Sequence, residues 1–439
     1  MKNQVHTCTF RSVLAIALAV VSSPLLAASV GQVVVRQQWP WSNKVNIDYV
    51  LVDAANGGHD VTVTIRDGAN PVEIAPGSLS GDLYGVMPGE RRIVWDPSYG
   101  GVERPKMYTS LTATVSVGDD SRMWMIVDLS AGMSAGSFPI SFTNAPPSGG
   151  WNQDVYKTTK LVLRRIKAST FVMGMTAAEI EHFGNPPYSD TPANVCKRHR
   201  TTLTQDYYIG VFPVTCGHAY QIDGYTGAYS ASTHGKYPAY NTCYAYLRGT
   251  NSWDAANWPR LDEESFLGRL NAKTPAIGSE LPGYKFDLPS HAQWECACRA
   301  GTDTCWNDGS SWAEGGTAAT DANLDNLAVY KKSGPDTVGK KTPNAFGIFD
   351  MHGLFFERIR DRYSVYYANH SGADETDPLI YSSTAASWSW ATWSCGGAWN
   401  SDAKICQSSY MQASGSVTDH TSDYMYGFRL AVVPKLAGD

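Results

Sequence analysis

The residues best suited to chemistry gather near the C-terminal end of the chain. The segment that starts at Cys395 reads CGGAWNSDAKICQSSYMQASGS, continues through a polar run and reaches YGFRL at 426–430. Cysteine thiolates bind soft cations, whereas a serine hydroxyl is a hard donor that does not replace a thiolate. Cys406 is therefore a candidate soft-metal ligand, and Ser401 ahead of it is no equivalent partner. The alternatives for Cys406 are a buried thiol or half of a disulfide.

Four sequence blocks precede this segment and must position it. They read TFVMG at 170–174, HRTTLTQDYYIGVFPVT at 199–215, LPSHAQWECACRAGT at 288–302 and VGKKTPNAFGIFDMHGLFFE at 338–357. Together with the GGAW and GFR motifs, these blocks resemble the formylglycine-generating enzyme, or sulfatase-modifying factor, family. The resemblance implies an α+β domain of C-type-lectin-like fold over residues 157–436.

The resemblance also carries an expectation about catalysis. Oxidases of this family hold Cu(I) between two cysteines and convert a cysteine of a sulfatase to formylglycine. Those two cysteines correspond to Ser401 and Cys406 here, so half of the pair is missing. We therefore expect no copper site and no oxidase activity, with Cys406 as the catalytic thiol if activity survives. Cys395 is the alternative second thiol, although it precedes the glycine pair in a different strand.

A calcium site is a further implication of the resemblance. Its ligands would be the side chains of Asp350 and Glu357 and the main-chain carbonyls of Gly353 and Phe355. Two carboxylates with carbonyl oxygens suit a hard cation that takes six to eight oxygen ligands. The alternative is that the two acidic residues only form hydrogen bonds in turns.

Asn323 belongs to a second, weaker calcium site that the resemblance implies. It lies in DANLD at 321–325, whose spacing is also typical of the start of an EF-hand loop. That loop needs glycine at its sixth position and glutamate at its twelfth. Asn326 and Lys332 stand there instead, so an EF-hand is excluded.

The N-terminal part predicts a leader and a separate all-β domain. Residues 1–28 have a basic flank, a short apolar run and a small-residue exit, which is typical of a secretory signal. Alternating apolar residues at 45–51, 61–65 and 113–117 predict an immunoglobulin-like β-sandwich over 29–143. The Pro/Gly/Ser-rich stretch at 144–156 is the expected linker.

Location and cysteine content follow from the leader. No other apolar run approaches the ~20 residues that span a bilayer, so we expect a secreted, periplasmic or surface-exposed bacterial protein. Cleavage removes Cys8 from nine cysteines and leaves an even number, which predicts disulfides of undetermined pairing. Within the C-terminal domain, 263–273 and 291–299 are the expected helices.

Binding is the function that we favour from the sequence. The net charge of −6 argues against nucleic acid as a partner. Residues 363–393 are rich in Tyr, Ser, Thr, Ala, Asn and Trp, and residues 407–424 in Ser, Tyr, Asp and Thr, a composition that binding loops share. The family's Asn, Val, Trp and following Trp are replaced here by Leu354, Phe355, Phe356 and Arg358.

These substitutions lead to three readings of the chain. We favour a catalytically degenerate module that binds an extracellular protein or glycan. The alternatives are an active formylglycine-generating oxidase and a structural surface protein.

Overall fold

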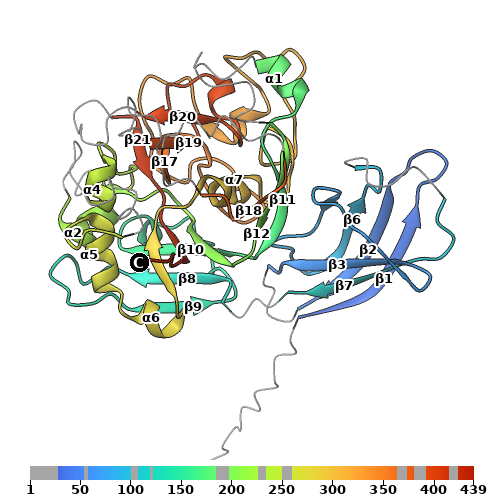
Figure 1. The fold of residues 1–439 in the computed structure, drawn as a ribbon, viewed down its shortest axis with the longest axis horizontal. Coiled ribbons are helices and arrows are strands. Elements are labelled where there is room, and N and C mark those ends of the chain that lie inside the picture. Colours follow the sequence, from blue (N-terminus) through green and yellow to red (C-terminus); the bar gives the residue numbers. More distant parts are fainter. Residues whose placement is uncertain are drawn as a thin grey trace, which may run out of the picture.

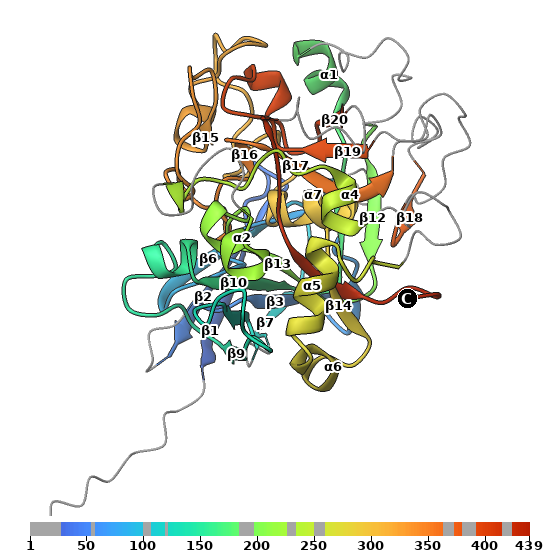
Figure 2. The same cartoon turned by 90° about the vertical axis from the view of Figure 1, so that its left-hand side faces the viewer.

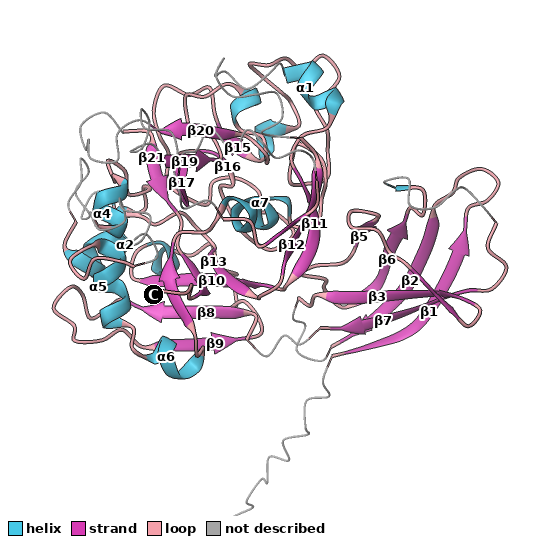
Figure 3. Ribbon diagram, in the orientation of Figure 1, coloured by secondary structure: helices cyan, strands magenta, loops and turns pink. Residues whose placement is uncertain are grey.

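The computed structural model describes residues 28–53, 58–99, 107–118, 122–183, 197–225, 234–249, 260–362, 373–379, 392–414 and 424–439. Figure 1 shows a β-sandwich beside a larger α+β domain. Strands and loops dominate both, and the helices are short (Figure 3). Among these residues no helix combines the length and apolar character that crossing a membrane requires. The predicted leader lies almost wholly outside them.

The N-terminal domain consists of two facing antiparallel sheets. The first has the order β1-β2-β6-β5, with β1 Ser29–Gln37, β2 Val45–Val52, β6 Gly89–Trp95 and β5 Leu79–Gly81. The second has the order β4-β3-β7, with β4 Asn70–Val72, β3 Val61–Asp67 and β7 Leu111–Val117. Alternate residues of β2 are buried in one apolar core. The predicted period-two strands are therefore confirmed.

The predicted boundary at residue 143 differs from the structure. Strands β8 (Trp124–Asp128) and β9 (Ile140–Thr143) belong to the C-terminal domain, where β8 pairs with β10 (Lys160–Ile166). Met125 and Val127 are fully buried in that domain's core. The change of domain therefore falls between β7 and β8. The predicted boundary lies at the Pro/Gly/Ser-rich stretch after residue 143, and composition does not show which sheet the preceding strands join.

The C-terminal domain is built on two sheets with a helix between them (Figure 2). The six-stranded sheet has the order β14-β22-β13-β10-β8-β9, with β14 Tyr284–Asp287, β22 Ala431–Pro434 and β13 Tyr207–Gly210. The four-stranded sheet has the order β20-β19-β17-β21, with β20 Met411–Ser414, β19 Thr392–Cys395, β17 Phe356–Arg362 and β21 Tyr426–Phe428.

Smaller elements complete this domain. Helices α2 (Cys216–Asp223), α4 (Tyr244–Arg248), α5 (Phe266–Lys273) and α6 (Ala276–Glu280) pack on the six-stranded sheet. A three-stranded sheet joins β11 (Ser169–Met173), β12 (His199–Leu203) and β18 (Glu375–Thr376). The others are α1 (Ala177–Phe183), the short pair β15 (Ala328–Val329) and β16 (His352–Gly353), and the 3-10 turns at Asp154–Lys157, Leu324–Asn326 and Ala403–Ile405.

Helix α7 (His291–Arg299) is the central element. Ser290 caps it by accepting a hydrogen bond from the Gln293 N–H, and the Gln293 side chain accepts one from the Ser290 N–H in return. All nine of its residues are buried, because residues of both large sheets pack around it. The prediction of a helix over 291–299 is confirmed, and α5 confirms most of the predicted 263–273.

The two domains touch through an aromatic and charged interface. The Tyr84 ring of the sandwich lies 4.8 Å from the Phe346 ring, edge to face. A Cβ on Gly301 would clash with the same tyrosine, so this glycine lets the ring approach closely. An ion pair of 2.5 Å joins Asp60 to Arg164 beside the rings. The domains are thus packed together at this point.

Replacing Tyr84 with alanine should weaken this interface. Loss of this partly buried ring removes its packing against Phe346 and Gly301, at a cost of about 1–2 kcal/mol. We expect a lower midpoint in urea unfolding, with little change for Tyr220→Ala, which alters an exposed ring. Equal stability of both variants would show that the interface contributes nothing.

Candidate functional site

Two consecutive glycines shape the turn that holds Cys406. Gly396 and Gly397, just after β19, have φ values of +90° and +77°, which favour glycine. A Cβ on Gly397 would lie 2.7 Å from the Cys406 sulfur, and one on Gly396 would lie 3.2 Å from the Met351 carbonyl oxygen. The glycine pair therefore lets the chain fold tightly over the thiol.

Cys406 and Ser401 lie under this turn without forming a reactive pair. Cys406 is fully buried, and burial raises the pKa of its thiol well above the ordinary value. The Ser401 hydroxyl is also buried and accepts a hydrogen bond of 2.9 Å from the Ala398 N–H. The serine thus stabilises the turn, and the cysteine is a protonated, inaccessible thiol at neutral pH.

Cys395 does not supply the missing thiol. It packs in the cluster that contains Trp294, whereas Cys406 packs in a different cluster with Cys305 and Trp306. Burial also raises the pKa of the Cys395 thiol. Copper(I) needs two accessible thiolates at one point. The residues present do not fit such a site.

His352 on β16 contacts the backbone carbonyl of Cys406. Its Nδ1 donates a 2.6 Å hydrogen bond to the Cys406 carbonyl, and its Nε2 accepts one of 3.2 Å from the Asn307 N–H. This arrangement requires the neutral ring. Burial lowers the pKa of His352 to about 4, so the ring stays neutral at physiological pH. His352 is thus a positioning residue for the backbone.

The predicted calcium ligand Glu357 is engaged by an arginine. Arg429 donates to both of its carboxylate oxygens at 2.7–3.2 Å, and Trp294 Nε1 donates to Oε2 at 2.7 Å. Arg429 also donates to the carbonyls of Gly210 and Phe349, each at 2.8 Å. All of these groups are buried in the centre of the domain. The guanidinium therefore supplies the positive charge that Glu357 needs.

Asp350 and the Gly353 carbonyl also accept hydrogen bonds within the domain. Asp350 accepts a 2.7 Å hydrogen bond from the Gly339 N–H, and the Gly353 carbonyl accepts one of 2.9 Å from the Phe355 N–H. Burial raises the pKa of Asp350 to about 6, against the opposing effects of Gly339 and Arg429. Asp350 and Glu357 do lie near each other, as predicted. The structure thus shows hydrogen-bonding roles for both acidic residues, and the calcium site stays a prediction.

Asn323 likewise has a structural role. Its N–H donates to Asp321 Oδ1 at 2.9 Å, and its side-chain amide donates to the Ser311 carbonyl at 2.8 Å. Asp321 Oδ2 accepts from the Ala313 N–H at 3.0 Å. In the described part of the chain, no group of three or more His, Cys, Asp or Glu residues could hold a metal ion. These residues tie one loop together.

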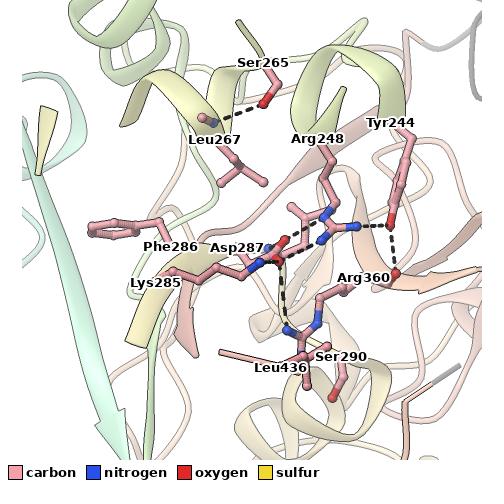
Figure 4. Close-up of polar contacts among 12 residues, drawn as sticks. Tyr244, Arg248, Ser265, Leu267, Lys285, Phe286, Asp287, Ser290, Arg360 and Leu436 are labelled. Atoms are coloured by element: carbon pink, nitrogen blue, oxygen red, sulfur yellow. Dashed lines mark hydrogen bonds and ion pairs between the residues drawn. The ribbon is translucent and has the colours of Figure 1, made fainter. Parts of the chain in front are cut away.

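A buried ionic cluster surrounds Asp287 at the end of β14 (Figure 4). Arg248 of α4 contacts both carboxylate oxygens, at 2.8 and 3.0 Å, and Lys285 and Arg360 lie 3.3 and 3.9 Å away. Burial alone would raise the pKa of Asp287, but these three cations hold it well below its usual range. Sequence reasoning missed this cluster, because no local pattern reveals a partner as far along the chain as Arg248.

The chain enters or leaves the four-stranded sheet at three adjacent points of one end. Arg362 at the end of β17 is paired with Thr392 at the start of β19, and Thr392 is paired with Ser414 at the end of β20. The chain therefore leaves or enters this sheet at three adjacent points. The Tyr/Ser/Trp-rich segments follow or precede these points, and most of 363–391 and 415–423 lies outside the described residues.

The predicted disulfides are not seen among the described cysteines. Buried thiols outside any disulfide are found at Cys216, Cys296, Cys298, Cys305, Cys395 and Cys406. Cys196 lies outside the described residues.

Comparison with known proteins identifies the larger domain. The sulfatase-modifying factor enzyme 1-like domain matches residues 157–433. The chain belongs to this family. No curated protein matches it. The two-domain reading, with a C-type-lectin-like sulfatase-modifying factor domain after an all-β module, is therefore confirmed.

Similar solved structures each cover somewhat more than three fifths of this chain. Treponema denticola variable protein 1 is 22% identical, with a TM-score of 0.43, 63% of this chain covered and 96% of that one. PvdO from Pseudomonas aeruginosa is 17% identical, with a TM-score of 0.42 and coverages of 62% and 94%. CarF is 17% identical, with a TM-score of 0.34 and coverages of 62% and 98%.

Replacing Asp350 with asparagine should test the calcium assignment in this sulfatase-modifying factor domain. The folded pKa near 6 exceeds the unfolded value of 3.8, so the folded state binds the proton more tightly. Stability is then lost as the pH rises from about 4 to 6, and the loss amounts to about 2–3 kcal/mol. Asparagine stays neutral and tolerates the positive φ at this residue.

We therefore expect the variant to match the native protein at pH 4 and to exceed it in stability at pH 7.5. Urea unfolding at both pH values measures this difference. Millimolar calcium should change neither protein. A calcium-dependent gain in the native protein that the variant loses would show that Asp350 binds calcium and would contradict this expectation.

Proposed function

We propose that this chain is a secreted, catalytically inactive member of the sulfatase-modifying factor family that binds an extracellular protein or glycan. The observation that carries the proposal is the state of Cys406. Its thiol is buried and protonated, and the position of the second catalytic cysteine holds a serine that hydrogen-bonds the turn. The site has the family's scaffold without the groups that oxidation needs.

The residues that replace the family's groove positions are not available to a ligand. The residues that replace the family's groove, Leu354, Phe355 and Phe356, are buried and pack inside the domain. Arg358, at the family's second tryptophan position, is also buried and donates to the Thr242 carbonyl at 2.6 Å. These positions stabilise the domain, so a ligand must contact a different surface.

The end of the four-stranded sheet is the surface that we assign to ligand binding. The chain crosses this end at three adjacent points. Residues 363–391 are rich in tyrosine, serine and tryptophan, and residues 415–423 in serine, threonine and aspartate. Aromatic rings give large contact areas at low entropic cost, and small hydroxyl residues supply adaptable hydrogen bonds. Rigid strands beneath variable loops are the usual platform for such recognition.

Binding by the mature protein to arrays of extracellular glycans and cell-surface proteins tests this proposal. Trp388 and Trp390 are the tryptophans just before β19. Their joint replacement by alanine should weaken binding at least tenfold, about 1.4 kcal/mol, because buried tryptophans dominate binding energy.

Two control variants accompany this experiment. Trp41→Ala removes a tryptophan that is 90% exposed on the sandwich, and Cys406→Ala removes the thiol. Each folded variant should bind within twofold of the native protein. Unchanged binding by the tryptophan double variant, or loss of binding on removal of the thiol alone, would contradict the proposal.

A further inference from the structure

A cleft of about 910 Å³ lies between the β-sandwich and the C-terminal domain. Figure 1 shows β11 and β12 on the side of the larger domain that faces the sandwich. One wall consists of residues 61–63 and 73–77 of the sandwich, and the other of residues 166–172. The side chains on one face of a strand alternate, so an unbroken run of lining residues means that the cleft follows a strand edge. That edge is β11.

The free edge of β11 offers backbone hydrogen-bonding groups. β11 is the outer strand of its sheet, and its Thr170 is paired with Thr202 of β12. The Thr202 carbonyl accepts a 2.8 Å hydrogen bond from the Asp377 N–H, so its backbone faces β18. Thr170 and Thr202 therefore form a non-hydrogen-bonded pair of the antiparallel ladder. In such a pair, the N–H and C=O groups of both residues point away from the partner strand. The N–H and C=O of the exposed Thr170 therefore point into the cleft.

The floor of the cleft carries a cation in a polar setting. Arg200 and Thr202 of β12 alternate with buried residues and line the cleft, as do Asp374 and Thr376 next to them. Arg200 is half-buried, and no ion pair within 4 Å joins it to a described carboxylate. A half-buried charge gains more from a counter-ion than an exposed one, because water screens it less. Arg200 therefore sets the preference of the cleft for negative charge.

The other carboxylates of the cleft do not cancel this preference. Asp60 pairs with Arg164, Asp303 pairs with Arg198, and Glu375 lies 3.6 Å from His199. The remaining two, at Glu73 and Asp374, are exposed and well screened. An incoming carboxylate would find its strongest partner at Arg200.

We propose that this cleft binds an extended peptide segment of another protein, which adds as a strand to the edge of β11 and places an acidic side chain on Arg200. Main-chain hydrogen bonds to Thr170 would give affinity, and the arginine would select the acidic residue. The apolar wall, with Val63 and Ile74, would receive side chains of the opposite face of the peptide. Asp374 and Thr376 of the 363–391 segment line this cleft. The proposal nevertheless rests on Thr170 and Arg200 and not on Trp388 or Trp390, so either proposal can fail without the other.

Peptides of defined sequence test this proposal. The probe is an array of acetylated, amidated seven-residue peptides with β-branched flanks and a central aspartate, asparagine or lysine. The best aspartate peptide is then titrated calorimetrically into the mature full-length chain. We expect binding that weakens at least tenfold with central asparagine. N-methylation at alternate residues, which removes main-chain donors, should abolish it.

Variants of the protein locate the binding. Arg200→Gln should weaken it at least tenfold, while Arg269→Gln on α5 should leave it unchanged. Thr170→Pro removes an outward N–H without breaking a bond to β12 and should also weaken binding. Thermal unfolding checks each fold, and the N-methylated peptide tests the edge even if Thr170→Pro is unstable.

Three outcomes would overturn the proposal. They are the absence of any binding aspartate peptide, equal binding by Arg200→Gln, and equal binding of the N-methylated peptide. Binding of oligogalacturonate in place of peptides would equally overturn it and assign the cleft to an acidic glycan.

Discussion

The buried ion pair between Glu357 and Arg429 is the interaction on which the C-terminal domain depends. It joins β17 to the segment after β21. Trp294 connects α7 to the pair, and the Gly210 and Phe349 carbonyls connect β13 and the loop before β16. Two charges far from water are tolerated only because they pair with each other and form further hydrogen bonds to Trp294 and to two carbonyls. Removing either partner would leave the other charge unpaired in the core, at a cost of about 3–5 kcal/mol.

This constraint explains how the domain can keep its fold with a serine at one position of the proposed thiol pair. The glycine turn, the cap of α7 and the GFR strand all serve the packing around the ion pair, so they are retained. Ser401 and Cys406 lie outside that network. A hydroxyl at 401 satisfies the Ala398 N–H, and the thiol fills space beside Cys305 and Trp306. The scaffold is therefore free to present other surfaces for recognition.

Sequence reasoning found local features and missed long-range partners. The ends of α7 were predictable because Ser290 and Gln293 form a cap within one turn. The loss of the thiol pair was readable because Ser401 is placed by its distance from the glycine pair. The membership of β8 and β9 was not readable, since composition does not show which sheet a strand joins. The roles of Asp350 and Glu357 depend on Gly339 and Arg429, which only the folded chain brings near them.

A copper(I) titration of the mature protein tests the central claim most directly. Competition with a colorimetric chelator would be followed by incubation with a sulfatase-derived cysteine peptide and mass spectrometry. We predict that the protein forms no one-to-one copper complex through Cys406, because the buried thiol has no second thiolate partner. We also predict that the peptide's cysteine is not converted to an aldehyde. Stoichiometric copper bound through Cys406, with aldehyde formation, would contradict this account.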